Sequence, residues 1–280
     1  SGAIEVATTR PETMLGDTAV AVHPQDDRYR KHIGQKIELP LTGRIIPVIG
    51  DEFVDPDFGT GCVKVTPAHD PNDFEIGKRH DLDFINIMNP DASLNDNVPE
   101  QFKGLTREDA RKQVIEKLKT CKLITNEKSY THSVGFSERG GVPIEYYLSE
   151  QWYLKMKALA EPAIKAVKDG DIKFHPPHWV KTYDHWMKNI KDWCISRQLW
   201  WGHRIPVWYK KGEDSSLKEN IHVSVVGPKD PENWEQDEDI LDTWASSWIW
   251  PFGVHDWPKN SDDLNSFYPT NTLVTGPDII

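Results

Sequence analysis

The chain has 280 residues, of which 38 % are hydrophobic and 28 % are charged, and its formal net charge is −11. This composition is typical of a folded globular protein and excludes a disordered one, and the lack of any apolar run of about 18 residues excludes a membrane-spanning helix. The acidic balance excludes a protein that binds nucleic acid over a broad basic surface, although a local pocket could still hold one nucleic-acid end.

The cysteines indicate the redox compartment of the protein, and the two ends of the chain indicate that it belongs to a longer sequence. Cys62, Cys121 and Cys194 form an odd, scattered set without metal-ligand spacing. Such a set is typical of a reducing compartment, so we expect a cytoplasmic protein. The chain opens with Ser-Gly-Ala and ends without a stop signal, so we expect it to be a piece of a longer protein.

The first part of the chain predicts short strands joined by turns, with a few helices. Alternating residues bounded by Gly, Pro or Asp predict strands over residues 4–6, 19–23, 44–49 and 62–66. Asp70 followed by Pro71 predicts a helix start, and Thr106 with Asp109 predicts another. Many short strands with a minority of helices favour a small, β-barrel-like mixed α/β domain.

The second part differs in composition, because all twelve tryptophans lie after residue 151. This shift predicts a domain boundary between about residues 135 and 150. Further on, the pattern predicts helices over residues 161–168 and 178–194, and strands over residues 204–209, 221–226 and 272–275.

A first polar motif, Ala-Thr-Thr-Arg-Pro-Glu-Thr, spans residues 7–13. Its threonine hydroxyls can accept or donate a hydrogen bond, and Arg10 offers a rigid fork of five donors for a carboxylate or phosphate. The group therefore suits a polar ligand that carries an ester or a phosphate. A threonine-capped turn in which Arg10 pairs with Glu12 explains the same residues equally well, and both interpretations stay open.

A second polar motif covers residues 59–73. Lys64 and Thr66 are two apart on a predicted strand and so share a face, and Asp70 and Asp73 lie at the start of the following helix. The helix dipole should lower the pKa of these carboxyls and keep them ionised, which suits binding of an α-amino group or orientation of water. The alternative is purely structural: Asp70 is an N-cap and Asp73 completes a capping box.

Tryptophans stand beside Ser, Arg, Gln or Asp in residues 193–203 and 237–248. An apolar wall with polar anchors is typical of a pocket for a small amphiphilic molecule. Stacking on a sugar ring and ordinary core packing are the alternatives.

Taken together, the motifs resemble the valyl-tRNA synthetase family of class I aminoacyl-tRNA ligases. The matching strings are residues 7–17, 59–75, 193–206, 239–250 and 273–280, in the order and approximate spacing of that family. The resemblance implies an editing domain over residues 1–140, a helical stalk over 141–190 and part of the second half of a Rossmann-type catalytic domain over 191–280. It also implies that the elements that contact ATP lie elsewhere, so ATP with Mg²⁺ would serve the parent enzyme only.

The implied activity is hydrolysis of threonine that has been wrongly esterified to tRNA(Val), with the 3′ end of that tRNA and its threonyl or valyl group as partners. A valine pocket cannot strongly reject threonine, an isostere that adds only a hydroxyl, so a second site must remove it. No cofactor is implied for this step and no metal. The family's zinc knuckle is not expected, because residues 209–238 contain no cysteine.

The resemblance also implies roles for single residues. Asp73 would hold the α-amino group, and Lys64, Thr66 and Asp70 would read the threonine side chain and position water. Substrate binding would fall to Thr8, Thr9, Arg10, Thr13 and His69, and the valine pocket of the parent enzyme to Trp201, Asp239 and Trp244. Two alternatives remain: a module that binds the tRNA end without turnover, and a tryptophan-rich binder of carbohydrate or nucleotide unrelated to the family.

Overall fold

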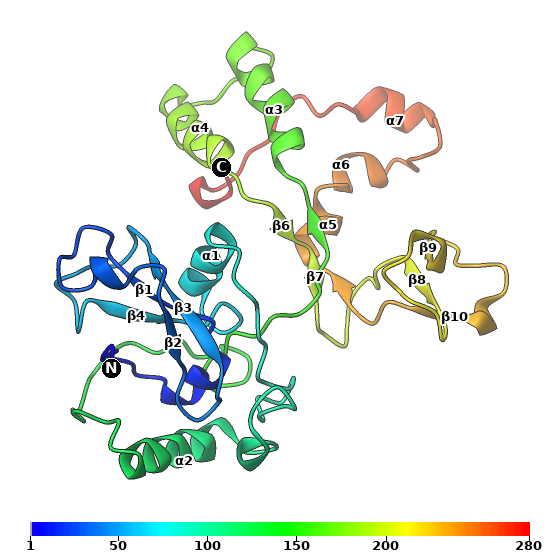
Figure 1. Cartoon of the computed structure of the whole chain (residues 1–280). Helices are drawn as coiled ribbons and strands as arrows, with labels where there is room; N and C mark the ends of the chain where they lie inside the picture. Colours follow the sequence, from blue (N-terminus) through cyan, green and yellow to red (C-terminus); the bar gives the residue numbers. More distant parts are fainter. Residues whose placement is uncertain (1) are drawn as a thin grey trace. The chain divides into compact units, whose positions relative to one another are not determined.

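The computed structural model describes residues 2–280 and divides into two compact units, here called unit 1 (up to Ser149) and unit 2 (from Glu150). Figure 1 labels the elements of both units. Among the described residues, no helix is both long enough and apolar enough to cross a bilayer. The division of the sequence into residues 1–140, 141–190 and 191–280 stays a prediction.

Unit 1 is built on one mixed four-stranded sheet. Its strands are β1 (Ala19–Val22), β2 (Lys36–Glu38), β3 (Ile45–Gly50) and β4 (Cys62–Val65), in the order β2-β3-β1-β4. β1 pairs with β3 in parallel and with β4 antiparallel, and β2 pairs antiparallel with β3. The α/β class is confirmed, but in residues 2–280 this sheet is open at β2 and β4 and forms no closed barrel.

Residues 4–6, expected as a strand, are not one. Ile4 and Val6 pack against the core on one side of the sheet, which explains their alternating pattern, but they are not part of its hydrogen-bonded ladder. A strand needs backbone hydrogen bonds to a neighbouring strand as well as alternating side chains. Here the side chains are packed, but the backbone of residues 4–6 is paired with no strand among residues 2–280.

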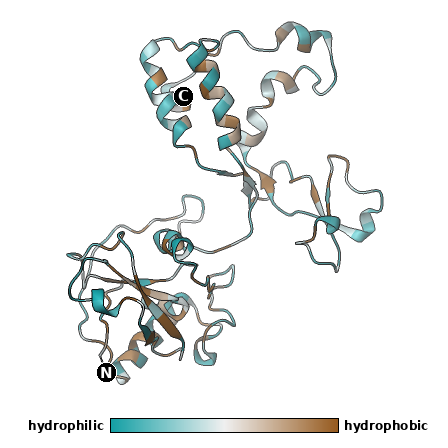
Figure 2. Ribbon diagram, turned by 45° about the horizontal axis from the view of Figure 1, so that its top comes forward, coloured by the Kyte–Doolittle hydropathy of each residue, from teal (hydrophilic) through white to brown (hydrophobic). Residues whose placement is uncertain are grey.

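The central strand β1 is buried along its whole length because it supplies two cores. Val20 and Val22 pack with Val48 on one face, whereas Ala19 and Ala21 pack on the other face with a cluster that includes Ile76. Figure 2 shows hydrophobic residues on the strands of this sheet. The sheet is therefore packed against apolar side chains on both faces, which fixes the backbone that carries the polar residues at its ends.

The two predicted helix starts of unit 1 are confirmed. Asp70 caps α1 (Pro71–Arg79) by accepting hydrogen bonds from two backbone N–H groups of the first turn, and Pro71 takes the first helical position. Thr106 caps α2 (Arg107–Thr120) through the N–H of Asp109. A 3₁₀ segment, η1 (Pro11–Gly16), and α2 contribute to a third core around Phe102.

Unit 2 is made of short helices and small sheets. Its helices are α3 (Lys157–Asp169), α4 (Val180–Lys188), α5 (Thr243–Ser247), α6 (Trp250–Gly253) and α7 (Asp262–Phe267). Its strands are β5 (Tyr153–Leu154), β6 (Trp193–Cys194), β7 (Ser196–Arg197), β8 (Val207–Lys210), β9 (Ile221–Val223), β10 (Trp234–Gln236) and β11 (Ile240–Leu241). They form a three-stranded sheet in the order β10-β8-β9 and two strand pairs, β11-β7 and β5-β6.

Several expectations for unit 2 need correction. The helix expected from residue 161 begins at Lys157 and contains Pro162. The helix expected over 178–194 ends at Lys188, because Trp193 and Cys194 pair with β5 instead. Residues 272–275 form no strand: Leu273 and Val274 are exposed and have no partner strand.

Candidate functional site

A cluster of polar side chains is buried in unit 1 where η1, the end of β4 and the start of α1 meet. Its members, which we call the polar cluster, are Glu12, Thr13, Asp17, Thr66, His69 and Asp73, each less than 9 % exposed, together with the largely buried Lys64. Burying polar groups is costly unless each finds a hydrogen-bond partner. Hydrogen bonds within the cluster and to neighbouring residues give each of these side chains at least one partner and fix its direction.

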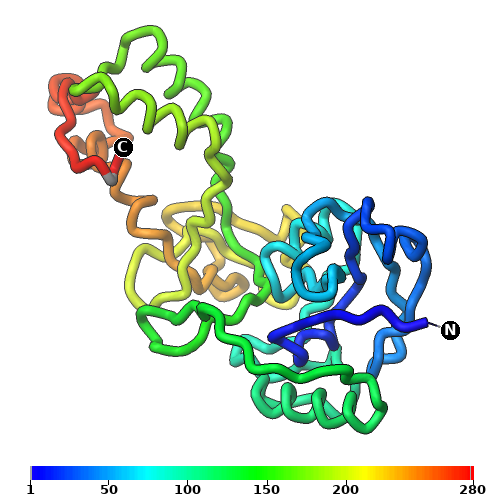
Figure 3. The backbone as a smooth tube through the Cα atoms, turned by 90° about the vertical axis from the view of Figure 1, so that its left-hand side faces the viewer, coloured from blue at the N-terminus to red at the C-terminus, as the bar shows by residue number. Residues whose placement is uncertain are grey.

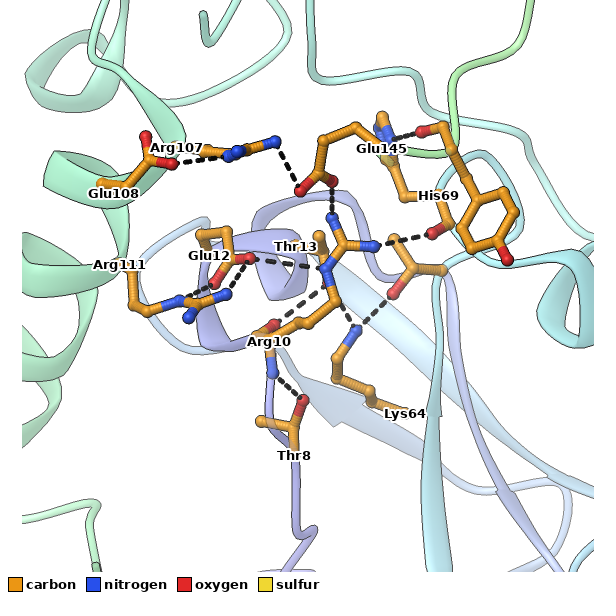
Figure 4. Close-up of polar contacts among 12 residues, drawn as sticks. Thr8, Arg10, Glu12, Thr13, Lys64, His69, Arg107, Glu108, Arg111 and Glu145 are labelled. Atoms are coloured by element: carbon orange, nitrogen blue, oxygen red, sulfur yellow. Dashed lines mark hydrogen bonds and ion pairs between the residues drawn. The ribbon is translucent and has the colours of Figure 1, made fainter. Parts of the chain in front are cut away.

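Lys64 lies at the centre of the polar cluster (Figure 4). Its Nζ donates to Thr13 Oγ1 at 2.8 Å, to Thr66 Oγ1 at 2.6 Å and to Asp17 Oδ1 at 3.3 Å. An ammonium group has three N–H donors, so all of them are used inside the protein. Lys64 thus orders two hydroxyls and balances a carboxylate. It has no N–H group left to donate to a ligand, so the geometry does not support the prediction that Lys64 reads the threonine side chain directly.

Asp17 is a member that the sequence analysis missed. Its Oδ1 accepts the hydroxyl of Thr66 at 2.5 Å as well as the Lys64 ammonium. Burial raises the pKa of Asp17 to about 6, although Lys64 and the hydrogen bond from Thr66 act in the opposite direction. With its proton directed to Asp17 and one lone pair facing Lys64, the Thr66 oxygen has one acceptor position left.

Asp73 is held differently from expectation. Its Oδ2 accepts the backbone N–H of Thr66 at 2.9 Å, so the carboxylate leaves its own helix end and the capping box is not formed. Burial raises its pKa to about 6, although the hydrogen bond from the Thr66 N–H and the charge of Lys64 act in the opposite direction, and the predicted lowering is wrong for this residue. Asp73 Oδ1 and Asp70 Oδ2 have no hydrogen-bond partner among residues 2–280 and remain available as acceptors.

His69 joins three segments. Its Nδ1 lies 3.0 Å from the carbonyl oxygen of Tyr146, and its Nε2 accepts the N–H of Ile87 at 2.9 Å. These partners require the tautomer that carries its proton on Nδ1. Burial lowers the pKa of His69 to about 4, so the ring is neutral at pH 7. With both nitrogens used, the geometry favours a supporting role over the predicted direct contact with substrate.

Arg10 is fixed by three acceptors at the side of the polar cluster. Its Nε donates to Glu12 Oε1 at 3.4 Å, its Nη1 donates to the carbonyl oxygen of His69 at 3.2 Å, and its Nη2 donates to Glu145. Glu12 is fully buried and also forms a bidentate pair with Arg111, with both distances 2.9 Å. The predicted Arg10–Glu12 pair is present, whereas the parts played by Arg111 and Glu145 were missed.

The remaining residues of the first motif lie outside the polar cluster. Thr8 and Thr9 are exposed, and Thr8 Oγ1 accepts the backbone N–H of Arg10 at 2.9 Å. The chain beyond α2 returns to this N-terminal segment (Figure 3), where Thr125 Oγ1 donates to Glu5 Oε1 at 2.7 Å. The structure therefore brings Arg10, Thr13, Lys64, Thr66 and Asp73 together and leaves Thr8 and Thr9 exposed to solvent.

The chemistry open to the polar cluster and the adjacent Asp70 is binding of hydrogen-bond donors. Their unused groups are carboxylate oxygens, which suit an ammonium or a hydroxyl. Cys62 is no nucleophile here, because it packs in the core and burial raises the pKa of its thiol. Within the part of the chain that is described, no group of three His, Cys, Asp or Glu side chains is arranged to hold a metal ion.

The residues predicted for a valine pocket lie in unit 2. Pairing of β11 with β7 brings the segment after Arg197 beside the one that contains Asp239, and Gln198 Nε2 donates to Asp239 Oδ2 at 2.8 Å. Trp201 and Trp244 are 91 % and 59 % exposed. Both tryptophans are thus open to solvent, and the pocket stays a prediction.

Comparison with known proteins gives consistent matches over the whole chain. The chain is 56 % identical to a valine–tRNA ligase of Bacillus licheniformis, 56 % to one of Treponema denticola and 58 % to one of Anoxybacillus flavithermus. The matches cover 99–100 % of this chain and 30–32 % of the relatives, so the chain spans about a third of their length.

Two further comparisons concern a solved structure and a family. The structure titled "The crystal structure of GlLeuRS-CP1" matches with a TM-score of 0.36 and 15 % identity, over 45 % of this chain and 83 % of that one. The family model described as "tRNA synthetases class I (I, L, M and V)" matches residues 8–280. Because this match includes the polar cluster and nearly all of both units, the chain belongs to the class I tRNA synthetases of the isoleucine, leucine, methionine and valine group.

Proposed function

We propose that unit 1 carries the editing site of a valine–tRNA ligase and hydrolyses threonine wrongly esterified to tRNA(Val). The observation that carries the proposal is the polar cluster together with the adjacent Asp70: the donors of Lys64 are used within the cluster, and one carboxylate oxygen each of Asp70 and Asp73 accepts no hydrogen bond among residues 2–280. Free acceptors suit the two donors that distinguish a threonyl ester, its α-ammonium and its hydroxyl.

Selection against valine follows from the same free hydrogen-bond acceptors. The threonine hydroxyl can donate to an acceptor such as the last lone pair of Thr66 Oγ1 or a carboxylate oxygen. Valine places a methyl group there and leaves the buried acceptor without a partner. Such a loss costs about 1–3 kcal/mol for each group, which is the discrimination that an apolar pocket cannot provide.

The proposed reaction is attack of water on the ester carbonyl, which breaks the bond to the ribose oxygen and releases threonine and a tRNA with a free terminal hydroxyl. Asp73, ionised above pH 6, would hold the α-ammonium, and Arg10 would hold the nucleotide end near the ester. In this scheme the rate acceleration comes from positioning the water molecule and the ester, because the bimolecular reaction then proceeds as a unimolecular step within one complex.

The wider assignments belong to the same proposal. Unit 1 would be the editing domain, and unit 2 would hold the stalk and part of the Rossmann-type catalytic domain with its valine pocket. ATP with Mg²⁺ would serve ester formation by the whole ligase in the cytoplasm, and no step of the hydrolysis uses it. We do not expect this chain alone to attach valine to tRNA.

The test is deacylation of threonyl-tRNA(Val) by the chain. We expect faster release of threonine than in buffer, no acceleration for valyl-tRNA(Val), and a loss of about a hundredfold on Asp73→Ala, because the ammonium is no longer held. Glu75→Ala is the matched control, since Glu75 lies on the same helix but is exposed.

Two results would speak against hydrolysis. If the folded chain at micromolar concentration does not accelerate release, the proposal fails. If it also binds an acceptor-end oligonucleotide, the alternative of a binding module without turnover is favoured.

A further inference from the structure

We infer that Glu145 is a positioning residue that fixes Arg10 for the nucleotide end of the substrate, an inference that rests on the proposed editing function. Glu145 lies beyond α2 and 135 residues after Arg10 in the sequence. Its carboxylate bridges two arginines: one oxygen binds Arg10 Nη2, and the other accepts Arg107 Nη1 at 2.9 Å. Figure 4 shows Glu145 between the two guanidinium groups.

The backbone beside Glu145 is docked on the polar cluster as well. The carbonyl oxygen of Tyr146 receives the Nδ1–H of His69, and the carbonyl oxygen of His69 itself accepts Arg10 Nη1. Residues 145 and 146 therefore reach Arg10 by two routes, one through a side chain and one through the buried imidazole. Contacts of this kind indicate a segment seated on the site rather than a loop that passes over it.

Arg10 needs such support because a free arginine side chain has many rotamers. Glu12 alone is a weak anchor, since its bond to Arg10 is 3.4 Å long and its two oxygens also serve Arg111. Glu145 contributes a second carboxylate on a different nitrogen. Three of the five N–H groups are then engaged, and two have no partner among the described residues and can meet a ligand.

The charges allow positioning to be separated from a simple electrostatic effect. Glu12, Glu108 and Glu145 balance Arg10, Arg107 and Arg111 in this group of ion pairs. Removing Glu145 leaves one net positive charge. If Glu145 only competed with the polyanionic tRNA for Arg10, removing Glu145 would tighten substrate binding and lower KM. If Glu145 positions Arg10, removing it should weaken substrate binding and raise KM.

The experiment compares Glu145→Ala, Glu145→Gln and the control Glu108→Ala in the full chain. Glu108 is exposed and also pairs with Arg107, but not with Arg10. We expect Glu145→Ala to lower kcat/KM for threonyl-tRNA(Val) about tenfold, mainly through KM, with partial rescue by Glu145→Gln and no change in Glu108→Ala. In an Arg10→Ala background, Glu145→Ala should cause no further loss.

A second readout does not depend on hydrolysis. Solvent exchange of the Arg10 Nε–H, followed by NMR, should become faster in Glu145→Ala and stay unchanged in Glu108→Ala. An unchanged exchange rate, or a lower KM in Glu145→Ala, would overturn the inference. If exchange accelerates but the wild-type chain does not deacylate the substrate, the positioning of Arg10 stands and the editing function fails.

Discussion

The two units of this chain differ in what they bury. Unit 1 contains three hydrophobic cores and a buried polar cluster, whereas the buried apolar residues of unit 2 are few, among them Ile205, Val207 and Ile240. Unit 2 also exposes large apolar side chains, including Trp201 and Trp250. Buried charges must be held rigidly to be tolerated, and only unit 1 has a core of that extent.

The difference separates two kinds of surface. Unit 1 presents a small preorganised site whose groups are already ordered by the protein. Unit 2 presents exposed aromatic surface, which in folded proteins marks places where another element or molecule binds. Since every tryptophan lies after residue 151, tryptophan fluorescence reports on unit 2 alone and offers a direct way to compare the units.

The largest expected effect is loss of a core side chain in unit 1. Phe102 is fully buried in the core beside α2, so Phe102→Ala should lower the free energy of unfolding by about 3–5 kcal/mol. The measurement is urea unfolding followed by far-UV circular dichroism.

The matched change in unit 2 is Phe267→Ala. Phe267 is 63 % exposed, so its loss should alter the free energy of unfolding by no more than about 0.5 kcal/mol, read from tryptophan fluorescence. Equal losses for the two phenylalanines would show that the units do not differ in packing as described.

A smaller effect is expected from the buried ion pairs that hold the site. Glu12→Gln keeps the shape of the side chain but removes the charge that faces Arg10 and Arg111, and should cost about 2 kcal/mol of stability. The figure is below that of a fully buried pair because Arg111 is about half exposed.

The control for Glu12 is Glu75→Gln. Glu75 is exposed and faces Lys78 at 3.9 Å, so its neutralisation should change stability by less than about 0.5 kcal/mol. A Glu12 variant as stable as the Glu75 variant would mean that the charges around Arg10 do not stabilise unit 1.

Predictions from the sequence succeeded where the cause is local. Asp70 and Thr106 cap their helices through backbone groups two or three residues away, and Lys64 meets Thr66 because alternate residues of a strand share a face. Partners distant in the chain were missed: Arg111 is 99 residues from Glu12, and Glu145 is 135 residues from Arg10. No local pattern marks such pairs, because the fold alone brings them together.

Two errors have the same origin. The helix dipole is a local property and predicted a lowered pKa for Asp73, but burial, which depends on the whole fold, raises it. Residues 272–275 were expected as a strand, yet a strand forms only where another strand is available, and the described structure gives this segment none. In both cases the surroundings, rather than the segment, decide the outcome.

The smallest expected effect is on pH dependence, and it again separates the units. Burial places the pKa of both Asp73 and Asp17 at about 6, so both are mainly ionised at pH 7 and take up protons as the pH falls through 6. A protonated Asp73 loses the charge that would hold the α-ammonium, so the enzyme-dependent rate of threonine release should be highest near pH 7 and fall about tenfold for each pH unit below 6. Asp73→Asn, a change confined to unit 1, should flatten the profile at a low rate. A wild-type rate that continues level to pH 5 would show that neither buried carboxylate needs its charge for the reaction.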